Sequence, residues 1–136
     1  MNEYLRALPE IDDDNREFWE SCKQHEMKLQ KCARCSAFRY YPSPVCPECS
    51  SFDAEWTRVQ GTGTIYTFSI VQRPPTPAWM DAVPYVYAVV NLEEGPMMPT
   101  NIIGCPVDEV RIDMKVEVVY DDVTPEVTLP KFRPVL

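Results

Sequence analysis

Two C-x-x-C pairs constrain the fold of this chain more than any other feature of its sequence. Cys32 and Cys35 form the first pair, and Cys46 and Cys49 form the second, with ten residues between the pairs. A two-residue spacing lets both sulfurs of a pair face one point, and the intervening segment has room for a short strand and a proline-rich turn. Four thiolates that meet as a tetrahedron satisfy a structural zinc ion, so the pattern predicts a closed zinc site.

The same cysteines permit other interpretations. Two disulfides or a redox pair fit less well, because no secretory leader is visible and a redox C-x-x-C motif normally occurs singly. A single iron ion, as in rubredoxin, stays open. Glycine commonly follows the second cysteine of such a pair at positive φ, whereas Ser36 and Ser50 stand here, at an expected cost of about 1 kcal/mol each. The nearby cations either donate to the sulfurs or are ordinary surface charges: Lys31, Arg34 and Arg39.

Length and composition predict one soluble domain with a small metal module. The chain has 136 residues, of which 45% are hydrophobic, and no run approaches the roughly 18 apolar residues that span a membrane. Its first ten residues lack the cationic start and apolar block of a signal peptide, so we expect a cytoplasmic protein. Cys22 and Cys105 should then remain reduced thiols.

The charge of the chain argues against nucleic-acid binding. The formal net charge is −8, and four thiolates with one divalent zinc add −4 + 2 = −2, which gives about −10 for the metal-bound form. Proteins that bind nucleic acid need a cationic face to displace counterions from phosphates, and the lysines and arginines here are scattered singly.

Residues 12–29 carry the signals of a helix. Asp14 as N-cap with Glu17 three residues later forms a capping-box pattern. An apolar stripe at helical spacing consists of Phe18, Cys22, His25 and Leu29. This stripe explains Cys22 and His25 better than a catalytic pair does, because a nucleophile and its base usually come from different elements. We expect a tail and a helix over residues 1–30.

Beyond the cysteines, alternating apolar and polar residues predict strands. One strand is expected at Glu55–Val59, and five more follow within 61–71, 85–92, 99–104, 116–123 and 127–132. In the first of these, alternation places Ile65 on the face opposite to Phe68 and Ile70. Five strands fit a small closed barrel of the OB type, in which Gly61 and Gly63 permit a strong bend. The predicted fold is mainly β: an N-terminal helix, a rubredoxin-like zinc ribbon at 31–54 and a five-stranded OB-fold barrel at 55–136.

The connection over residues 72–84 is unusual for a solvated loop. It holds four prolines together with the apolar pair Trp79 and Met80. Prolines stiffen a loop, which lowers the entropy lost on binding. Two interpretations have equal weight: Trp79 folds back as a lid on the barrel end, or the loop contacts a partner or ligand.

The whole pattern resembles one family. A helix with F-W, the zinc ribbon, G-T-G-T-I-Y-T-F-S-I-V, a proline-rich loop ending in P-Y-V, V-R-I-D-M-K-V-E-V and a closing L-P-K-F-R-P are similar to the OB-fold/zinc-ribbon proteins linked to acyl-CoA metabolism, long catalogued as a domain of unknown function. The resemblance covers roughly residues 14–134. It implies a partner of thiolase-type enzymes, or of related acyl-CoA hydratases and aldolases, in which the thiolase-like subunit carries the chemistry.

The residues agree with a non-catalytic subunit. Thiolase chemistry requires a nucleophilic cysteine, a histidine base and a second acid-base group, whereas this chain has one histidine and two free cysteines that are distant in sequence. We therefore expect a zinc-binding subunit of a thiolase-type acyl-CoA acyltransferase complex, in a hetero-oligomer that binds neither membrane nor nucleic acid. The surplus apolar residues expected at the partner interface are Phe18, Trp19, Trp79, Met80, Tyr85 and Phe132, with the N-terminal tail and the segment Pro134–Leu136.

Two further expectations concern ligands. If the chain contacts acyl-CoA, the cations for its phosphates are Arg73, Arg111, Lys131 and Arg133, with Lys115 beside them, although each fits a solvated strand end equally well. The alternative function is a single-stranded nucleic-acid module whose strands offer stacking surfaces at Tyr66, Phe68, Tyr85 and Tyr87. The acidity of the chain makes this the minor hypothesis.

Overall fold

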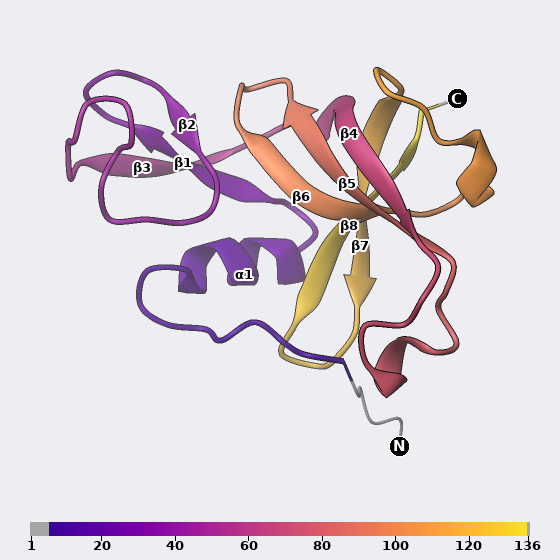
Figure 1. Ribbon diagram of the computed structural model, residues 1–136. Coiled ribbons are helices and arrows are strands. Elements are labelled where there is room, and N and C mark those ends of the chain that lie inside the picture. Colours follow the sequence, from indigo (N-terminus) through magenta and orange to yellow (C-terminus); the bar gives the residue numbers. More distant parts are fainter. Residues whose placement is uncertain (1–5, 136) are drawn as a thin grey trace.

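The computed structural model describes residues 6–135, in which a short helix precedes eight strands (Figure 1). The elements are α1 (Arg16–Lys23), β1 (Lys28–Cys32), β2 (Phe38–Arg39), β3 (Ala54–Arg58), β4 (Thr62–Val71), β5 (Tyr85–Leu92), β6 (Met97–Ile102), β7 (Lys115–Asp122) and β8 (Thr128–Pro134), with 3-10 turns η1 (Pro77–Trp79) and η2 (Val107–Glu109). Residues 1–5 and Leu136, which we expected to contribute to a partner interface, lie outside the described residues.

The helix α1 is shorter than the sequence predicts at both ends. Its N-cap is Asn15 and not Asp14, because the side chain of Asp12 accepts the N–H of Asn15 and turns the chain there. The helix ends at Lys23, because His25 takes a left-handed conformation with φ 61° and its N–H donates to the Cys22 carbonyl. The N–H of Glu26 donates in turn to Ser21, which completes a helix-terminating turn of the Schellman type.

A small sheet forms the ribbon, with strand order β2-β1-β3 and antiparallel pairing throughout. The strand expected at Glu55–Val59 is β3, and it pairs with β1 rather than with the barrel. The division expected between residues 54 and 55 therefore falls within a strand. The ribbon sheet extends to Arg58, where Lys28 is its partner.

The remaining five strands close into a barrel in the order β4-β5-β6-β8-β7, which confirms the predicted OB-type architecture. Four of the five seams are antiparallel and several residues long. The fifth, between β6 and β8, is parallel and has one register pair, Ile102 with Phe132. Pro99 and Pro130 stand on the two strands of this seam and have no N–H to donate, and the Thr100 hydroxyl donates across it to the Pro130 carbonyl at 3.1 Å.

Strand β4 departs from the alternation that the sequence suggested. A bulge between Ile65 and Thr67 shifts the register, so Ile65, Phe68 and Ile70 pack against the same core. The prediction that Ile65 faces away from Phe68 is therefore wrong. Gly63 allows β4 to pass close to β5, since a Cβ there would collide with the Asn91 carbonyl.

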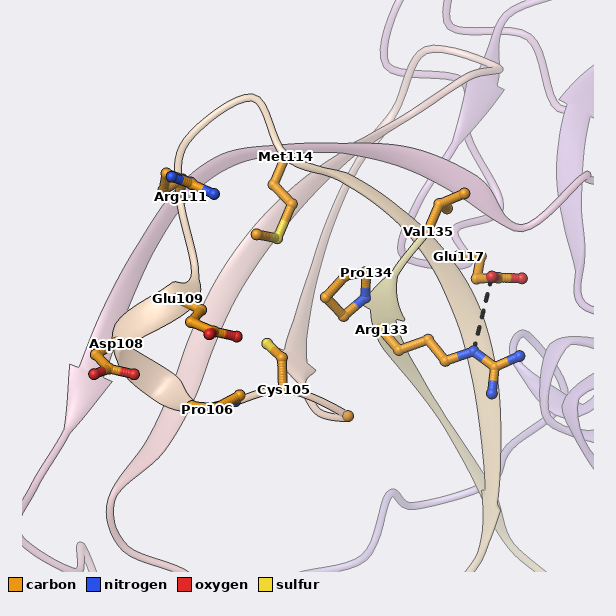
Figure 2. A pocket seen from close by; sticks show the side chains of 11 residues that line it. Cys105, Pro106, Asp108, Glu109, Arg111, Met114, Glu117, Arg133, Pro134 and Val135 are labelled. Carbon is orange, nitrogen blue, oxygen red and sulfur yellow. Dashed lines mark ion pairs between the residues drawn. The ribbon is translucent and has the colours of Figure 1, made fainter.

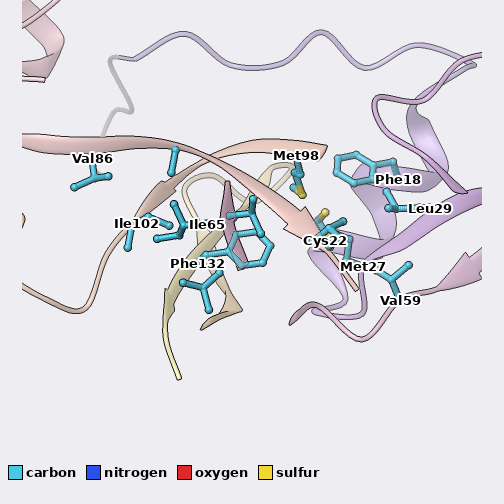
Figure 3. Close-up of a cluster of buried hydrophobic side chains, with 14 of the residues drawn as sticks. Phe18, Cys22, Met27, Leu29, Val59, Ile65, Val86, Met98, Ile102 and Phe132 are labelled. Atoms are coloured by element: carbon cyan, nitrogen blue, oxygen red, sulfur yellow. The ribbon is translucent and has the colours of Figure 1, made fainter. Parts of the chain in front are cut away.

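One apolar core runs from α1 and the base of the ribbon into the barrel (Figure 3). The fully buried side chains include Phe18, Met27, Leu29, Ile65 and Phe132, none of which exposes more than 1% of its surface. Phe18 and Phe132 were expected at a partner interface, and this prediction is wrong. Both rings are enclosed by the chain's own helix and strands, so they stabilise the fold and cannot meet a partner.

A polar contact fixes α1 to the β7–β8 hairpin. The ring of His25 stacks on Tyr120 with centroids 4.8 Å apart, and its Nε2 lies 3.0 Å from an Asp122 carboxylate oxygen. The Tyr120 hydroxyl accepts the Met27 N–H at 2.8 Å. The helix and the ribbon therefore lie on one side of the barrel (Figure 1). Among residues 6–135, no helix has both the length and the apolar character needed to cross a bilayer.

Candidate metal centre and barrel cleft

The four cysteines sit on two turns that repeat the same backbone hydrogen bonds. In the first turn the Cys32 N–H donates to Ala37 and the Ser36 N–H donates to Cys32, both at 2.9 Å. In the second, the Cys46 N–H donates to Ser51 and the Ser50 N–H donates to Cys46, again at 2.9 Å. Ser36 and Ser50 have φ of 66° and 64°, so both serines occupy the left-handed conformation expected of the missing glycines.

The four sulfurs lie within 4.8 Å of one another, in the arrangement that a tetrahedral ion requires. The Cys32 and Cys49 sulfurs are 3.5 Å apart, and those of Cys35 and Cys46 are 3.6 Å apart. Zinc–sulfur bonds of about 2.3 Å in a regular tetrahedron put sulfurs about 3.8 Å apart. The spacing and the all-sulfur donor set therefore fit zinc, in a closed site with no coordination position left for a substrate.

Backbone N–H groups prepare two of the four sulfurs, those of Cys32 and Cys46, for a cation. The Cys35 N–H points at the Cys32 sulfur over 3.4 Å and lowers the pKa of that thiol to about 6. The Cys49 N–H lowers the pKa of the Cys46 thiol in the same way. These dipoles stabilise thiolates, which are the form that binds a metal.

The cations near the site do not donate to the sulfurs in the described part of the chain. Arg39 is buried, and its Nε donates to the Gln30 side chain and the Ser43 carbonyl. Lys31 lies over the Phe38 ring at 5.7 Å. Within residues 6–135, no second cluster of metal-binding side chains accompanies the four cysteines.

Neither free cysteine forms a catalytic pair with His25. Cys22 is fully buried, and burial raises the pKa of its thiol to about 12, so it stays protonated. His25 has left the helix face of Cys22 and is held by Asp122. Burial and the nearby Glu109 charge raise the pKa of Cys105, which is the opposite of what a nucleophile needs.

Three aromatic residues expected at an interface have separate surroundings. Trp19 is buried, and its indole N–H donates to the Tyr41 hydroxyl at 2.9 Å. Trp79 stacks on Tyr85 with centroids 4.6 Å apart, and the Arg6 guanidinium lies over the Trp79 ring at 4.3 Å from its centroid. Trp79 is therefore folded back against the barrel, half-buried, and Arg6 further holds its loop through the Ala78 carbonyl.

An open cleft of about 1060 Å³ lies at the end of the barrel next to η2 (Figure 2). Arg111 and Arg133, two of the cations expected to contact phosphates, line it together. Three carboxylates share the cleft, and one of them, Glu117, lies 3.8 Å from the Arg133 Nε. The lining also includes Cys105, Asp108 and Glu109.

The other expected phosphate contacts lie elsewhere. Lys131 pairs with Asp121 at 2.7 Å on the outside of the barrel, and Arg73 stands exposed in the proline loop. Neither lines the cleft. Sequence reasoning did not identify the cleft, because its residues come from three segments that only barrel closure brings together. The turn G-C-P at 104–106 was the one local signal of an irregular backbone there.

Two family models match consecutive parts of the chain. The rubredoxin-like zinc ribbon domain of ChsH2 matches residues 19–55, and the C-terminal OB-fold domain of ChsH2 matches residues 56–121. The order of the two matches is the order of the ribbon and the barrel in the structure.

Known relatives of the chain are subunits and scaffolds by their descriptions. A probable enoyl-CoA hydratase alpha subunit of Thermomonospora curvata is 41% identical over 96% of this chain and 40% of that protein. The chain thus spans about two fifths of the length of that relative. A DUF35 domain-containing scaffold protein of Methanothermobacter thermautotrophicus is 31% identical over 76% of this chain and 78% of that protein.

A solved structure described as Ltp2-ChsH2(DUF35) aldolase has the same fold. It superposes with a TM-score of 0.85 and is 40% identical, and the match covers 95% of this chain and all of that chain. By their descriptions, one of these relatives is a subunit of a hydratase, one is a scaffold protein and one belongs to an aldolase, and none is described as a thiolase subunit.

Proposed function

This chain belongs to the ChsH2/DUF35 family of zinc-ribbon and OB-fold proteins, and from that premise we propose that it is a non-catalytic scaffold subunit of an acyl-CoA enzyme. The observation that carries the proposal is the match to a chain of the Ltp2-ChsH2(DUF35) aldolase over its full length. The side chains support it as well, because neither Cys22 nor Cys105 has a depressed pKa or a histidine base.

We propose an aldolase or a hydratase as the partner enzyme, in preference to a thiolase. These are the activities in the descriptions of the relatives that are 40% and 41% identical. The thiolase-type acyltransferase complex expected from the sequence is a narrower form of the same proposal. In either form the chain is part of a hetero-oligomer, and the reacting groups come from the other subunit.

The resident ion that we propose is one structural zinc. Its ligands are Cys32, Cys35, Cys46 and Cys49, and it supplies charge and cross-linking within the ribbon. Elemental analysis of the purified chain should give one equivalent of zinc in a colourless protein. A red protein with a visible absorption band would instead identify iron.

Direct contact with acyl-CoA is proposed for Arg111 and Arg133 only. They share a cleft, but its three carboxylates outnumber them, so the isolated chain should not hold the phosphates of coenzyme A. We expect no binding of coenzyme A to the isolated chain by calorimetry. In the complex, Arg133→Ala should raise KM for the acyl-CoA, whereas the matched change of the exposed Arg34 on the ribbon should leave KM unchanged.

The proposal is tested by co-expressing the chain with an Ltp2-type aldolase subunit. The expected result is a complex that survives size-exclusion chromatography, with aldolase activity that falls when this chain is omitted. The same experiment with an enoyl-CoA hydratase subunit and with a thiolase distinguishes the three partners. Separate elution from every partner, with each enzyme fully active alone, would refute the scaffold role.

A further inference from the structure

The outward side chains of β4, β5 and β6 form a wall of the barrel that carries no charge. Strand register and exposure place them on one face: Thr64, Tyr66, Thr67, Ser69, Val71, Tyr85, Tyr87, Val89, Asn91, Met97, Pro99 and Asn101. A quarter of the whole chain is charged, yet within the described strands none of these positions holds a lysine, arginine, aspartate or glutamate. We call this surface the uncharged wall.

Large apolar groups are exposed on the uncharged wall. Tyr66 exposes 60% of its surface, Tyr87 exposes 47% and Met97 exposes 40%. The register continues these groups into one surface, because Tyr87 lies between Ser69 and Asn101, and Val89 lies between Thr67 and Pro99. Depletion of charge with enrichment of tyrosine and methionine is the composition of the buried centre of protein interfaces.

The opposite wall of the same barrel is built differently. On β7 and β8 the outward residues pair as ions, with Lys131 on Asp121 at 2.7 Å and Arg133 beside Glu117 at 3.8 Å. Helix α1 also packs against these two strands. The barrel therefore has one wall that carries two of the ion pairs of the described chain and one wall that has no charge to pair.

The occupant of the uncharged wall is a different protein rather than a second copy. Apart from the ion pairs Asp81–Arg6 and Glu117–Arg133, the charged residues that flank its strands are three acids against two cations: Glu93, Glu94 and Asp113 against Arg73 and Lys115. Two copies that met through this wall would bring together two such rims and two net charges of −8. A partner with an apolar centre and a basic rim is complementary to it.

We propose that the uncharged wall is the surface that binds the acyl-CoA enzyme subunit, whose contact face is apolar with lysines and arginines around it. The inference rests on the proposed scaffold function and adds the surface and the chemistry of the partner. Tyr85 and the neighbouring Trp79 belong to this side of the barrel, whereas α1 packs against β7 and β8. The wall also has no cation for a phosphate backbone, so the exposed tyrosines do not make a nucleic-acid site.

The test compares Tyr87→Glu with two controls in binding to a purified Ltp2-type aldolase subunit. Tyr87→Glu places a carboxylate in a desolvated contact and should weaken binding by at least about tenfold. Tyr87→Phe keeps the ring and should bind like the parent chain. Phe52→Glu changes an aromatic residue that is 77% exposed on the ribbon, and it should also bind like the parent. Melting temperature and zinc content establish that each variant is folded.

The possible outcomes distinguish a wrong binding surface from a wrong scaffold function. If the complex forms equally well with Tyr87→Glu, the uncharged wall is not the binding surface, and the scaffold function is unaffected. If only Phe52→Glu loses binding, the interface lies on the ribbon instead. No complex even with the parent chain overturns both. Light scattering that shows a dimer dissociated by Tyr87→Glu assigns the wall to a second copy, and salt-dependent binding of an oligothymidine assigns it to nucleic acid. Either result would overturn the inference.

Discussion

In the ribbon, residues 28–58, three short strands are joined by two cysteine turns, and two of the buried side chains are metal ligands. In the barrel, residues 62–134, five strands enclose a core that includes Ile65, Val86 and Phe132. The ribbon holds its turns through four sulfurs, whereas the barrel holds its strands through apolar burial and hydrogen bonds. The two regions therefore owe most of their stability to different interactions, although one apolar core joins them at the base of the ribbon.

The largest effect is expected from the metal ligands. Structural zinc contributes on the order of 10 kcal/mol to folding, so Cys46→Ser or a chelator should unfold the ribbon. Hydrogen exchange should show lost protection in β1, β2 and β3 while β4 to β8 stay protected. Cys105→Ser is the matched control, because this cysteine lies outside the metal site and should leave exchange unchanged. Full zinc content and unchanged protection in Cys46→Ser would show that the two regions do not differ as described.

The converse test truncates a side chain in the core of the barrel. Phe132 is fully buried and pairs with Ile102 and Val118, so Phe132→Ala should cost about 3–5 kcal/mol through lost contacts and a cavity. Chemical denaturation measures this free energy. Zinc should stay bound in the native variant, because all four cysteines belong to the ribbon and none stands on a barrel strand. A loss below 1 kcal/mol would mean that the barrel does not depend on this core.

A smaller change concerns the backbone of the ribbon turns. Ser36 sits at φ 66°, a conformation that glycine adopts without the strain of a side chain. Ser36→Gly should therefore raise the stability of the zinc-bound chain by up to about 1 kcal/mol. Ser69→Gly in the barrel should lower it, because an extended strand position gains nothing from glycine. Equal destabilisation by both changes would contradict the interpretation of the serine turns.

The smallest effect is expected where the turn after α1 meets the barrel. Hydrogen bonds from Thr128 and then His25 hold the pKa of Asp122 below its ordinary value. The stabilisation is present above the aspartate pKa of the unfolded chain and is lost as pH falls through the lower pKa of the folded chain. Thr128→Val should raise the Asp122 pKa toward its ordinary value of about 3.9, as followed by NMR titration. His25→Gln should raise it less, and an unchanged pKa in both variants would exclude this contact.

Local residue patterns predicted most of the fold. Spacing alone pointed to the four cysteines that come together, and alternation grouped Val86, Ala88 and Val90 on one face of their strand, which is the buried face of β5. The end of α1 could not be predicted, because the left-handed position that stops it holds His25 where glycine or asparagine usually stands. The bulge in β4 was likewise missed, because it depends on the pairing of Thr67 with Val89 and leaves no mark on β4 itself.

The candidate surfaces show the same limit. Phe18 and Phe132 have the composition of interface residues, but only the packed structure shows that they are enclosed. The cleft and the uncharged wall both combine segments distant in the sequence, and the register of β4, β5 and β6 is needed to align the outward residues. Residue type thus indicated which apolar side chains could belong to an interface, while the topology of the fold determines which of them are exposed.

The uncharged wall limits how much of the isolated protein can stay in solution in a cell. Copies made in excess of their partner leave Tyr66, Tyr87 and Met97 open to any other apolar surface, without local charge to keep such surfaces apart. Matched synthesis of the two subunits, for instance from one transcript, keeps that excess small. We therefore expect the isolated subunit to lose solubility on overproduction and to regain it when its partner is made in equal amount.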